Sequence, residues 1–178
     1  MSKAINIRDI DPNSDAEIDL VAQRMRATLI EVEGEATGTE LYSMDWLRER
    51  VRWHLDSAAV VAKVLLAVDA DGEVTGHTIV RSELDAKGGA FGLISTTYVV
   101  PSARRSGVAE ALLQAGEHWI RSQSLESCAT WTSSTNSKLI RLYAKHGYTQ
   151  TEAHVHDTTG TLMVKLERRF AKHASTEG

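Results

Sequence analysis

The sequence predicts an α/β (α+β) fold with the element order β-α-α-β-β-β-α-β-α-β-β. Two observations predict it: apolar residues recur at the period of a helix in several segments, and short β-branched runs bounded by turn residues lie between them. Together these patterns indicate about six to seven strands and about four helices. With 178 residues, 42% of them apolar and 25% charged, the chain has the composition of one globular domain covering residues 1–178.

The N-terminal part is predicted to begin with a strand and a helix. Residues 4–8 alternate weakly between apolar and polar, as a first strand would. Ser14 followed by Glu17 has the pattern of a capping box, and an apolar stripe behind it predicts a helix to about Glu33. Residues 34–40 contain two glycines and no periodicity, which predicts a loop.

The next part is predicted to add a second helix and a β-hairpin. Ser43 is a suitable N-cap for this helix. Its apolar face is expected to be formed by Leu47, Val51 and Leu55, extended by Trp46 and Trp53. Residues 60–68 are rich in apolar and β-branched side chains, and Asp71-Gly72 is a strong hairpin signal before a strand at 73–81.

The second half is predicted to contain a long central strand and a closing hairpin. A glycine turn at 87–89 precedes the central strand at 91–100, which Pro101 ends because proline cannot serve an interior ladder. The remaining elements are expected to be a helix at 105–122, a strand at 128–132, a helix at 136–146 closed by Gly147, and a hairpin of 148–155 and 161–166. The tail, from about Arg168 to Gly178, is expected to be loose.

The segment most informative about function joins the central strand to a helix through small and basic residues. It comprises Tyr98, Val99, Val100, Pro101, Ser102, Ala103, Arg104, Arg105, Ser106, Gly107, Val108 and Ala109. A helix N-terminus leaves backbone N–H groups unpaired and carries a partial positive charge, so it can receive phosphate oxygens. Gly107 and Ala109 would let a diphosphate approach the main chain, and Arg104 and Arg105 would add charge-assisted hydrogen bonds. An ordinary helix start with solvated arginines is the alternative.

Two motifs in the sequence resemble those of the GNAT superfamily of N-acetyltransferases. The pattern R/Q-x-x-G-x-G/A after a strand is matched by residues 104–109, with Ala109 in place of the commoner final glycine. An asparagine followed by a helix ending Leu-Tyr-x-x-x-Gly-Tyr/Phe is matched by Asn136 and residues 142–148. The resemblance is firm over residues 91–166 and implies a single GNAT-type domain with a twisted, mixed and mostly antiparallel sheet.

By this resemblance, acetyl-CoA is the acyl donor and no metal is required. The backbone of Tyr98, Val99 and Val100 would pair with the pantetheine arm of the coenzyme, and the Val99 N–H is the candidate to polarise the thioester carbonyl. The diphosphate would be held by Arg104, Arg105, Ser106, Gly107, Val108 and Ala109. Asn136 would contact the coenzyme, and the Tyr143 hydroxyl would lie near its sulfur as general acid. The alternatives are a helix cap for Asn136 and a core position for Tyr143.

The general base is not identified by the motifs. Counting back along the central strand by its period of two, the residues that face the pocket are expected to be Thr97, Ser95 and Leu93. None of these is a base at its usual pKa. Glu83 and His77 on the preceding strand are alternatives, and so is a chain of water molecules.

The predicted acceptor is a primary amine of a small cationic molecule, such as a polyamine, an amino sugar or an amino acid derivative. The segment between the first two helices lies over the acceptor site in this superfamily. Here it contains Glu31, Glu33, Glu35 and Glu40, whose charges would attract a cation. An acidic loop that only keeps the protein soluble is the alternative. Two other functions stay open: a protein or peptide N-acetyltransferase, and a non-catalytic acyl-CoA-binding module.

Composition narrows the partners and the location. The net charge of −4 and the pI of about 6.0 argue against binding to nucleic acid. Apolar runs fall short of the ~20 residues of a membrane span and the N-terminus lacks a secretory pattern, so we expect a cytoplasmic protein that binds no membrane. Cys128 stands alone and is expected to be a small hydrophobe, while His154 and His156 lack a third nearby ligand, so no metal is expected. The oligomeric state stays open, and by analogy with relatives the exposed edge of the closing hairpin is a candidate surface for a homodimer.

Overall fold

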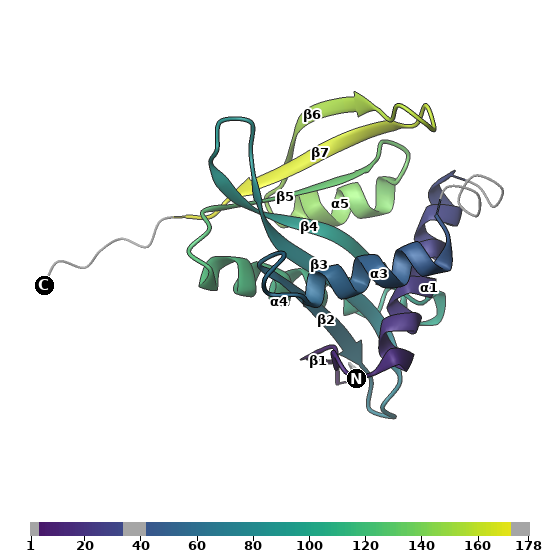
Figure 1. Cartoon of the computed structure of the whole chain (residues 1–178). Helices are drawn as coiled ribbons and strands as arrows, with labels where there is room; N and C mark the ends of the chain where they lie inside the picture. Colours follow the sequence, from purple (N-terminus) through teal and green to yellow (C-terminus); the bar gives the residue numbers. More distant parts are fainter. Residues whose placement is uncertain (1–3, 34–41, 172–178) are drawn as a thin grey trace, which may run out of the picture.

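The computed structural model describes residues 4–33 and 42–171, with the backbone alone at 31–33, and confirms the predicted element order (Figure 1). The strands are β1 (Asn6–Asp9), β2 (Ala62–Val68), β3 (Val74–Leu84), β4 (Ala90–Val99), β5 (Ser127–Ser133), β6 (Thr149–Val155) and β7 (Leu162–Arg169). The helices are α1 (Asp15–Glu33), α3 (Met44–Leu55), α4 (Val108–Ser122) and α5 (Ser137–Lys145).

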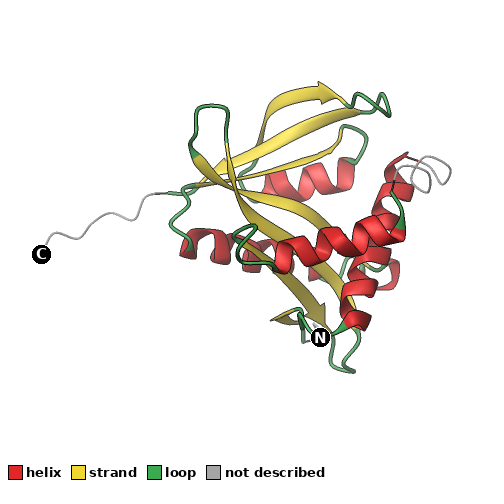
Figure 2. Cartoon of the chain, viewed as in Figure 1, coloured by secondary structure: helices red, strands yellow, loops and turns green. Residues whose placement is uncertain are grey.

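The strands form one sheet in the order β1-β2-β3-β4-β5-β7-β6. β4 and β5 pair in parallel and the other neighbours are antiparallel, so the predicted mixed, mostly antiparallel sheet is confirmed. Helices cover both faces (Figure 2). Because side chains alternate along a strand, Ile79 packs in the core under α1 and α3, while its neighbour Val80 packs in the core under α4 and α5. Among the described helices, none has the length and apolar character that a membrane span requires.

The predicted helix caps form, with one change of partner. The Ser14 hydroxyl accepts from the Glu17 N–H at 3.2 Å, and the Ser43 hydroxyl accepts from the Trp46 N–H at 3.1 Å. The Glu17 carboxylate accepts from the Asp11 N–H at 2.9 Å, because the Ser14 N–H is already bonded to the Asp11 carbonyl. Trp46 is 49% exposed, so it lies at the margin of the α3 apolar face and not within the core.

Helix α4 begins at Val108 and not at Arg105 as predicted. The residues before it form a short 3₁₀ turn, Pro101–Ala103, followed by two residues with positive φ: Arg105 at 66° and Gly107 at 86°. These φ values are incompatible with a right-handed helix. The segment predicted to bind phosphate is therefore a sharply bent turn that ends in a helix N-terminus.

The final strand is longer than predicted. β7 continues to Arg169 and the Phe170 N–H donates to the Glu126 carbonyl at 2.9 Å, so the expectation that the loose tail begins at about Arg168 is wrong for residues 168–170. Arg168 donates to the buried carboxylate of Glu117 on α4 at 2.6 Å, and the Tyr148 hydroxyl donates to the same oxygen at 3.0 Å. This tertiary network fixes a segment that its composition alone would leave free.

Substitution Arg168→Met should lower the free energy of unfolding by about 1–3 kcal/mol, because it leaves the buried Glu117 carboxylate without its cation. Thermal or urea unfolding measures the change. Arg169→Met is the matched control, since Arg169 is the next residue of the same strand and is exposed. Equal stability of the two variants would contradict a structural role for the Arg168–Glu117 pair.

Candidate active site

The sheet splits between β4 and β5. The two strands pair in parallel over a short stretch centred on Leu93 and Ala129, whereas β4 continues to Val99. Beyond this stretch the strands diverge (Figure 1). The vertex of the split is the point where pairing ends, at Ile94 and Thr130. There the Thr130 hydroxyl donates to the Ile94 carbonyl at 2.9 Å. The split therefore leaves a gap that is faced by backbone peptide groups.

The peptide groups of β4 alternate between β3 and this gap. The Val100 N–H donates to the Thr75 carbonyl at 2.9 Å, so the antiparallel ladder also directs the Tyr98 N–H toward β3. The Val99 N–H then points away from β3, toward the gap. The Val99 carbonyl accepts from Arg104 Nε at 3.1 Å. Of the three residues expected to pair with an extended ligand, Val99 is the one whose N–H faces the gap.

A β-bulge at Ser95 divides the two faces of β4. β3 pairs with the residues on either side of Ser95 but not with Ser95 itself. The Thr97 hydroxyl lies 2.9 Å from that of Thr78, on the side covered by α4. The Ser95 hydroxyl instead accepts from Arg81 at 3.2 Å, and Arg81 also contacts α3. The prediction that Leu93, Ser95 and Thr97 share one face is therefore wrong, because the bulge interrupts the period of two.

Helix α5 contributes both residues predicted from the second motif. Asn136 caps the helix, with its Oδ1 accepting from the Leu139 N–H at 3.3 Å. Tyr143 is buried, and its hydroxyl lies beside those of Thr97 in β4 and Thr130 in β5. Burial raises the pKa of Tyr143 above its usual value, while hydrogen bonds with the two threonines lower it. The phenol is therefore protonated at neutral pH and lies near the vertex of the split.

The turn between β4 and α4 has the geometry of a phosphate cradle. A Cβ added to Gly107 would meet nothing within 4 Å, so this face of the turn is open. Ala111 is the first residue of α4 whose N–H reaches a carbonyl of the preceding turn, that of Gly107 at 3.0 Å. The N–H groups without an acceptor in the helix are those of Val108, Ala109 and Glu110. Arg105 and Ser106 are exposed on the same turn, and open amides beside a guanidinium fit the phosphates of a coenzyme.

Neither residue considered as a base from the sequence is well suited to that role. His77 is completely buried, and burial lowers its pKa to about 3, so the imidazole accepts a proton poorly at neutral pH. Glu83 is ion-paired with Arg81 at 2.9 Å. Glu83 lines a cavity of about 390 Å³ together with Trp53 of α3 and Leu84 at the end of β3.

A larger cavity, of about 630 Å³, opens over β5, β6 and β7. Its lining residues are Trp131, Glu152, Ala153, His154, His156 and Met163. His154 lies in β6, whereas His156 follows the strand and its Nδ1 accepts from the backbone N–H groups of Thr158 and Thr159. Among the described residues, no group of three or more His, Cys, Asp or Glu side chains is arranged to hold a metal ion.

Cys128 is buried, as expected of a small hydrophobe, and burial raises the pKa of its thiol to about 12. Sequence analysis did not single out Thr130, although it follows Cys128 at the strand period and so faces the same side. It also did not single out Arg24. Arg24 lies three residues after Val21 in α1, which places it at the flank of the helix's apolar stripe.

A sheet that splits beside an open helix N-terminus, with a buried phenol at the vertex, defines a domain that can hold an extended, phosphorylated ligand across its strands. The comparison with family models agrees with the two motifs. The model described as "Acetyltransferase (GNAT) family" matches residues 22–148. The chain therefore belongs to the GNAT family of acetyltransferases.

Known proteins show the same likeness. The chain is 38% identical to aminoglycoside N(6′)-acetyltransferase type 1 of Klebsiella aerogenes over 92 aligned residues. The alignment covers 50% of this chain and 60% of that enzyme. A GCN5-related N-acetyltransferase from Kribbella flavida superposes with a TM-score of 0.72 at 20% identity, covering 94% of this chain and 98% of that one. The PaiA N-acetyltransferase from Thermoplasma acidophilum, solved with coenzyme A, has a TM-score of 0.66 at 16% identity, covering 94% and 99%. The two structures support the fold.

Substitution Gly107→Ala should weaken binding of CoA about tenfold or more, because the new methyl group occupies the open face of the cradle and the φ of 86° is strained for alanine. Gly72→Ala is the matched control, since Gly72 has φ of 84° and equally open surroundings in the β2–β3 turn. Both variants should lose about 1–2 kcal/mol of stability. Calorimetry with CoA separates them, and equal affinity in the two variants would remove the cradle from the site.

Proposed function

We propose that the protein is an acetyl-CoA-dependent N-acetyltransferase that acetylates a primary amine of a small cationic molecule by direct attack. The observation that carries this proposal is the arrangement around one vertex of the sheet. The Val99 N–H faces the gap that opens from this vertex, the open amides after Gly107 begin the helix that follows β4, and the protonated phenol of Tyr143 lies beside Thr97 and Thr130. These are the groups that thioester binding, phosphate binding and leaving-group protonation require.

Acetyl-CoA supplies the activated acetyl group as a thioester. In this proposal its pantetheine arm runs along β4 beside Tyr98, Val99 and Val100, with the Val99 N–H as the main-chain donor. Its phosphates are held by Arg104, Arg105, Ser106, Gly107, Val108 and Ala109. Asn136 uses Oδ1 to cap α5, which leaves its amide hydrogens to contact the coenzyme.

The reaction is a single displacement at the thioester carbonyl. The neutral amine attacks the carbonyl carbon, so the C–N bond forms as the C–S bond breaks. The Val99 N–H polarises the carbonyl oxygen, where negative charge develops. Tyr143 donates its proton to the departing thiolate and regains one from solvent. The amine nitrogen loses its proton to water, and no side chain is assigned as the base.

The acceptor is proposed to be cationic on two grounds. The segment before α3 carries Glu31, Glu33, Glu35 and Glu40, whose side chains lie outside the described residues. A relative that matches half of this chain is an aminoglycoside N-acetyltransferase by name, and amino sugars are cations. An amino sugar is accordingly the first acceptor class to test.

Replacing Glu33, Glu35 and Glu40 with Gln should raise the KM for a cationic amine, because fewer carboxylates attract it. Steady-state kinetics at low and high salt measure the effect, which salt should reduce. The KM for acetyl-CoA serves as the internal control and should not change. An unchanged amine KM would limit the segment to a solubility role.

An assay of thiol release from acetyl-CoA across an amine panel tests the function itself. The panel contains amino sugars, polyamines, amino acid derivatives and peptides with a free N-terminus. Turnover with a small cation supports the proposal, whereas preference for peptides selects a protein or peptide N-acetyltransferase. Binding of acetyl-CoA without turnover of any amine would select a non-catalytic acyl-CoA-binding module.

Substitution Tyr143→Phe should lower kcat by about 10²–10⁴-fold with little change in the affinity for CoA, because only the proton donor is removed. Tyr148→Phe is the matched control. Its ring packs edge-on against Tyr143 at 4.9 Å, but its hydroxyl donates to Glu117. If Tyr143→Phe retains kcat while Tyr148→Phe does not, the phenol of Tyr143 is a packing group and not the acid.

A further inference from the structure

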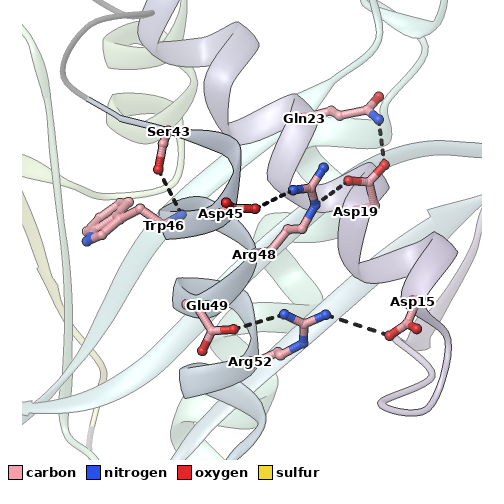
Figure 3. Close-up of polar contacts among 9 residues, drawn as sticks. All are labelled: Asp15, Asp19, Gln23, Ser43, Asp45, Trp46, Arg48, Glu49 and Arg52. Carbon is pink, nitrogen blue, oxygen red and sulfur yellow. Dashed lines mark hydrogen bonds and ion pairs between the residues drawn. The ribbon is translucent and has the colours of Figure 1, made fainter.

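Arg48 and Arg52 of α3 form ion pairs with carboxylates of α1 and α3 on the outer side of these helices. Figure 3 shows Arg48 between Asp19, at 2.7 Å, and Asp45, at 3.0 Å. Arg52 lies between Glu49, at 3.0 Å, and Asp15, at 3.7 Å. Each of these two guanidinium groups therefore has two carboxylates beside it.

Arg24, on the same helix α1, differs from these residues. Among the described residues it has no carboxylate partner, and its Nη1 is buried without a hydrogen-bond acceptor. Burial lowers the pKa of Arg24, yet arginine remains charged at any physiological pH. A half-buried cation without an anion is destabilising, and a bound anion would offset that cost. Arg26 also has a buried, unpaired Nε, but it is two residues further along the helix and no aromatic contact places it over β4.

The position of Arg24 indicates which anion it meets. Its guanidinium carbon lies 5.8 Å from the centre of the Tyr98 ring, and that of Arg104 lies 6.0 Å from the same ring. One guanidinium comes from α1 and the other from the turn between β4 and α4, and both lie beside the end of β4. His77 stacks on Tyr98 from β3 at 6.3 Å and brings no negative charge. The site thus gathers cations around a strand end where a phosphorylated ligand is expected.

We propose that Arg24 binds a phosphate group of the coenzyme, so that helix α1 forms part of the donor site. This inference rests on the proposed function. A phosphate suits this position better than an acceptor carboxylate, because Arg104 of the turn before α4 lies over the same Tyr98 ring and the proposed acceptor is a cation. A guanidinium and a phosphate oxygen form a charge-assisted hydrogen bond, which fits the unpaired Nη1.

Calorimetry with CoA tests the proposal on the variants Arg24→Gln and Arg48→Gln. Arg24→Gln should weaken binding about 10–100-fold, the range of one charge-assisted hydrogen bond. Arg48→Gln is the matched control, since it removes a guanidinium from the same helix pair at an ion pair on the outer side, and should bind CoA as the native protein does. Dephospho-CoA distinguishes the two phosphate sources: the loss persists if Arg24 meets the diphosphate and disappears if it meets the 3′-phosphate.

Acetyl-pantetheine, which has no phosphate, provides the decisive comparison. Native protein and Arg24→Gln should use it equally well as donor, because the interaction is absent from both. Arg24→Gln should also unfold at the same or a higher temperature, since it removes an unpaired charge. Equal CoA affinity in the two proteins, or a change confined to the amine KM, would overturn the proposal. Failure of the native protein to bind CoA would instead overturn the proposed function.

Discussion

The structure depends on one backbone constraint, the early end of pairing between β4 and β5. Peptide N–H and C=O groups left unpaired inside a sheet are unfavourable unless water or a ligand satisfies them. The Thr130 hydroxyl fixes where the pairing ends by donating to the Ile94 carbonyl at 2.9 Å. A ligand that carries its own amides can then continue the ladder along β4. The candidate site is for this reason built on main-chain groups, with few side chains needed.

Two local departures from regular structure organise the chemistry around this gap. The bulge at Ser95 sends its hydroxyl toward α3 and that of Thr97 toward α4. The left-handed residue Gly107 delays the start of α4, so that the helix N-terminus opens beside the gap. The two hydroxyls of β4 therefore face opposite sides of the sheet.

Local patterns predicted most of the fold because caps and turns depend on neighbouring residues. Ser14 and Ser43 cap the starts of α1 and α3 as expected, and Gly147, which has φ of 89°, follows the end of α5 as expected. The features that sequence analysis missed depend on distant contacts, such as Arg168 with Glu117, which are 51 residues apart. The same division holds in the site. Gly107 and Tyr143 belong to sequence motifs. The role proposed for Arg24 depends on the contact of α1 with Tyr98, which no local sequence pattern predicts.

The network behind Tyr143 has a consequence for the C-terminal strand. Tyr143 packs against Tyr148, which shares Glu117 with Arg168 near the end of β7. A continuous set of contacts in this way joins the proposed acid to the end of β7. Changes within β7 that displace Arg168 are therefore expected to disturb the packing of the proposed acid.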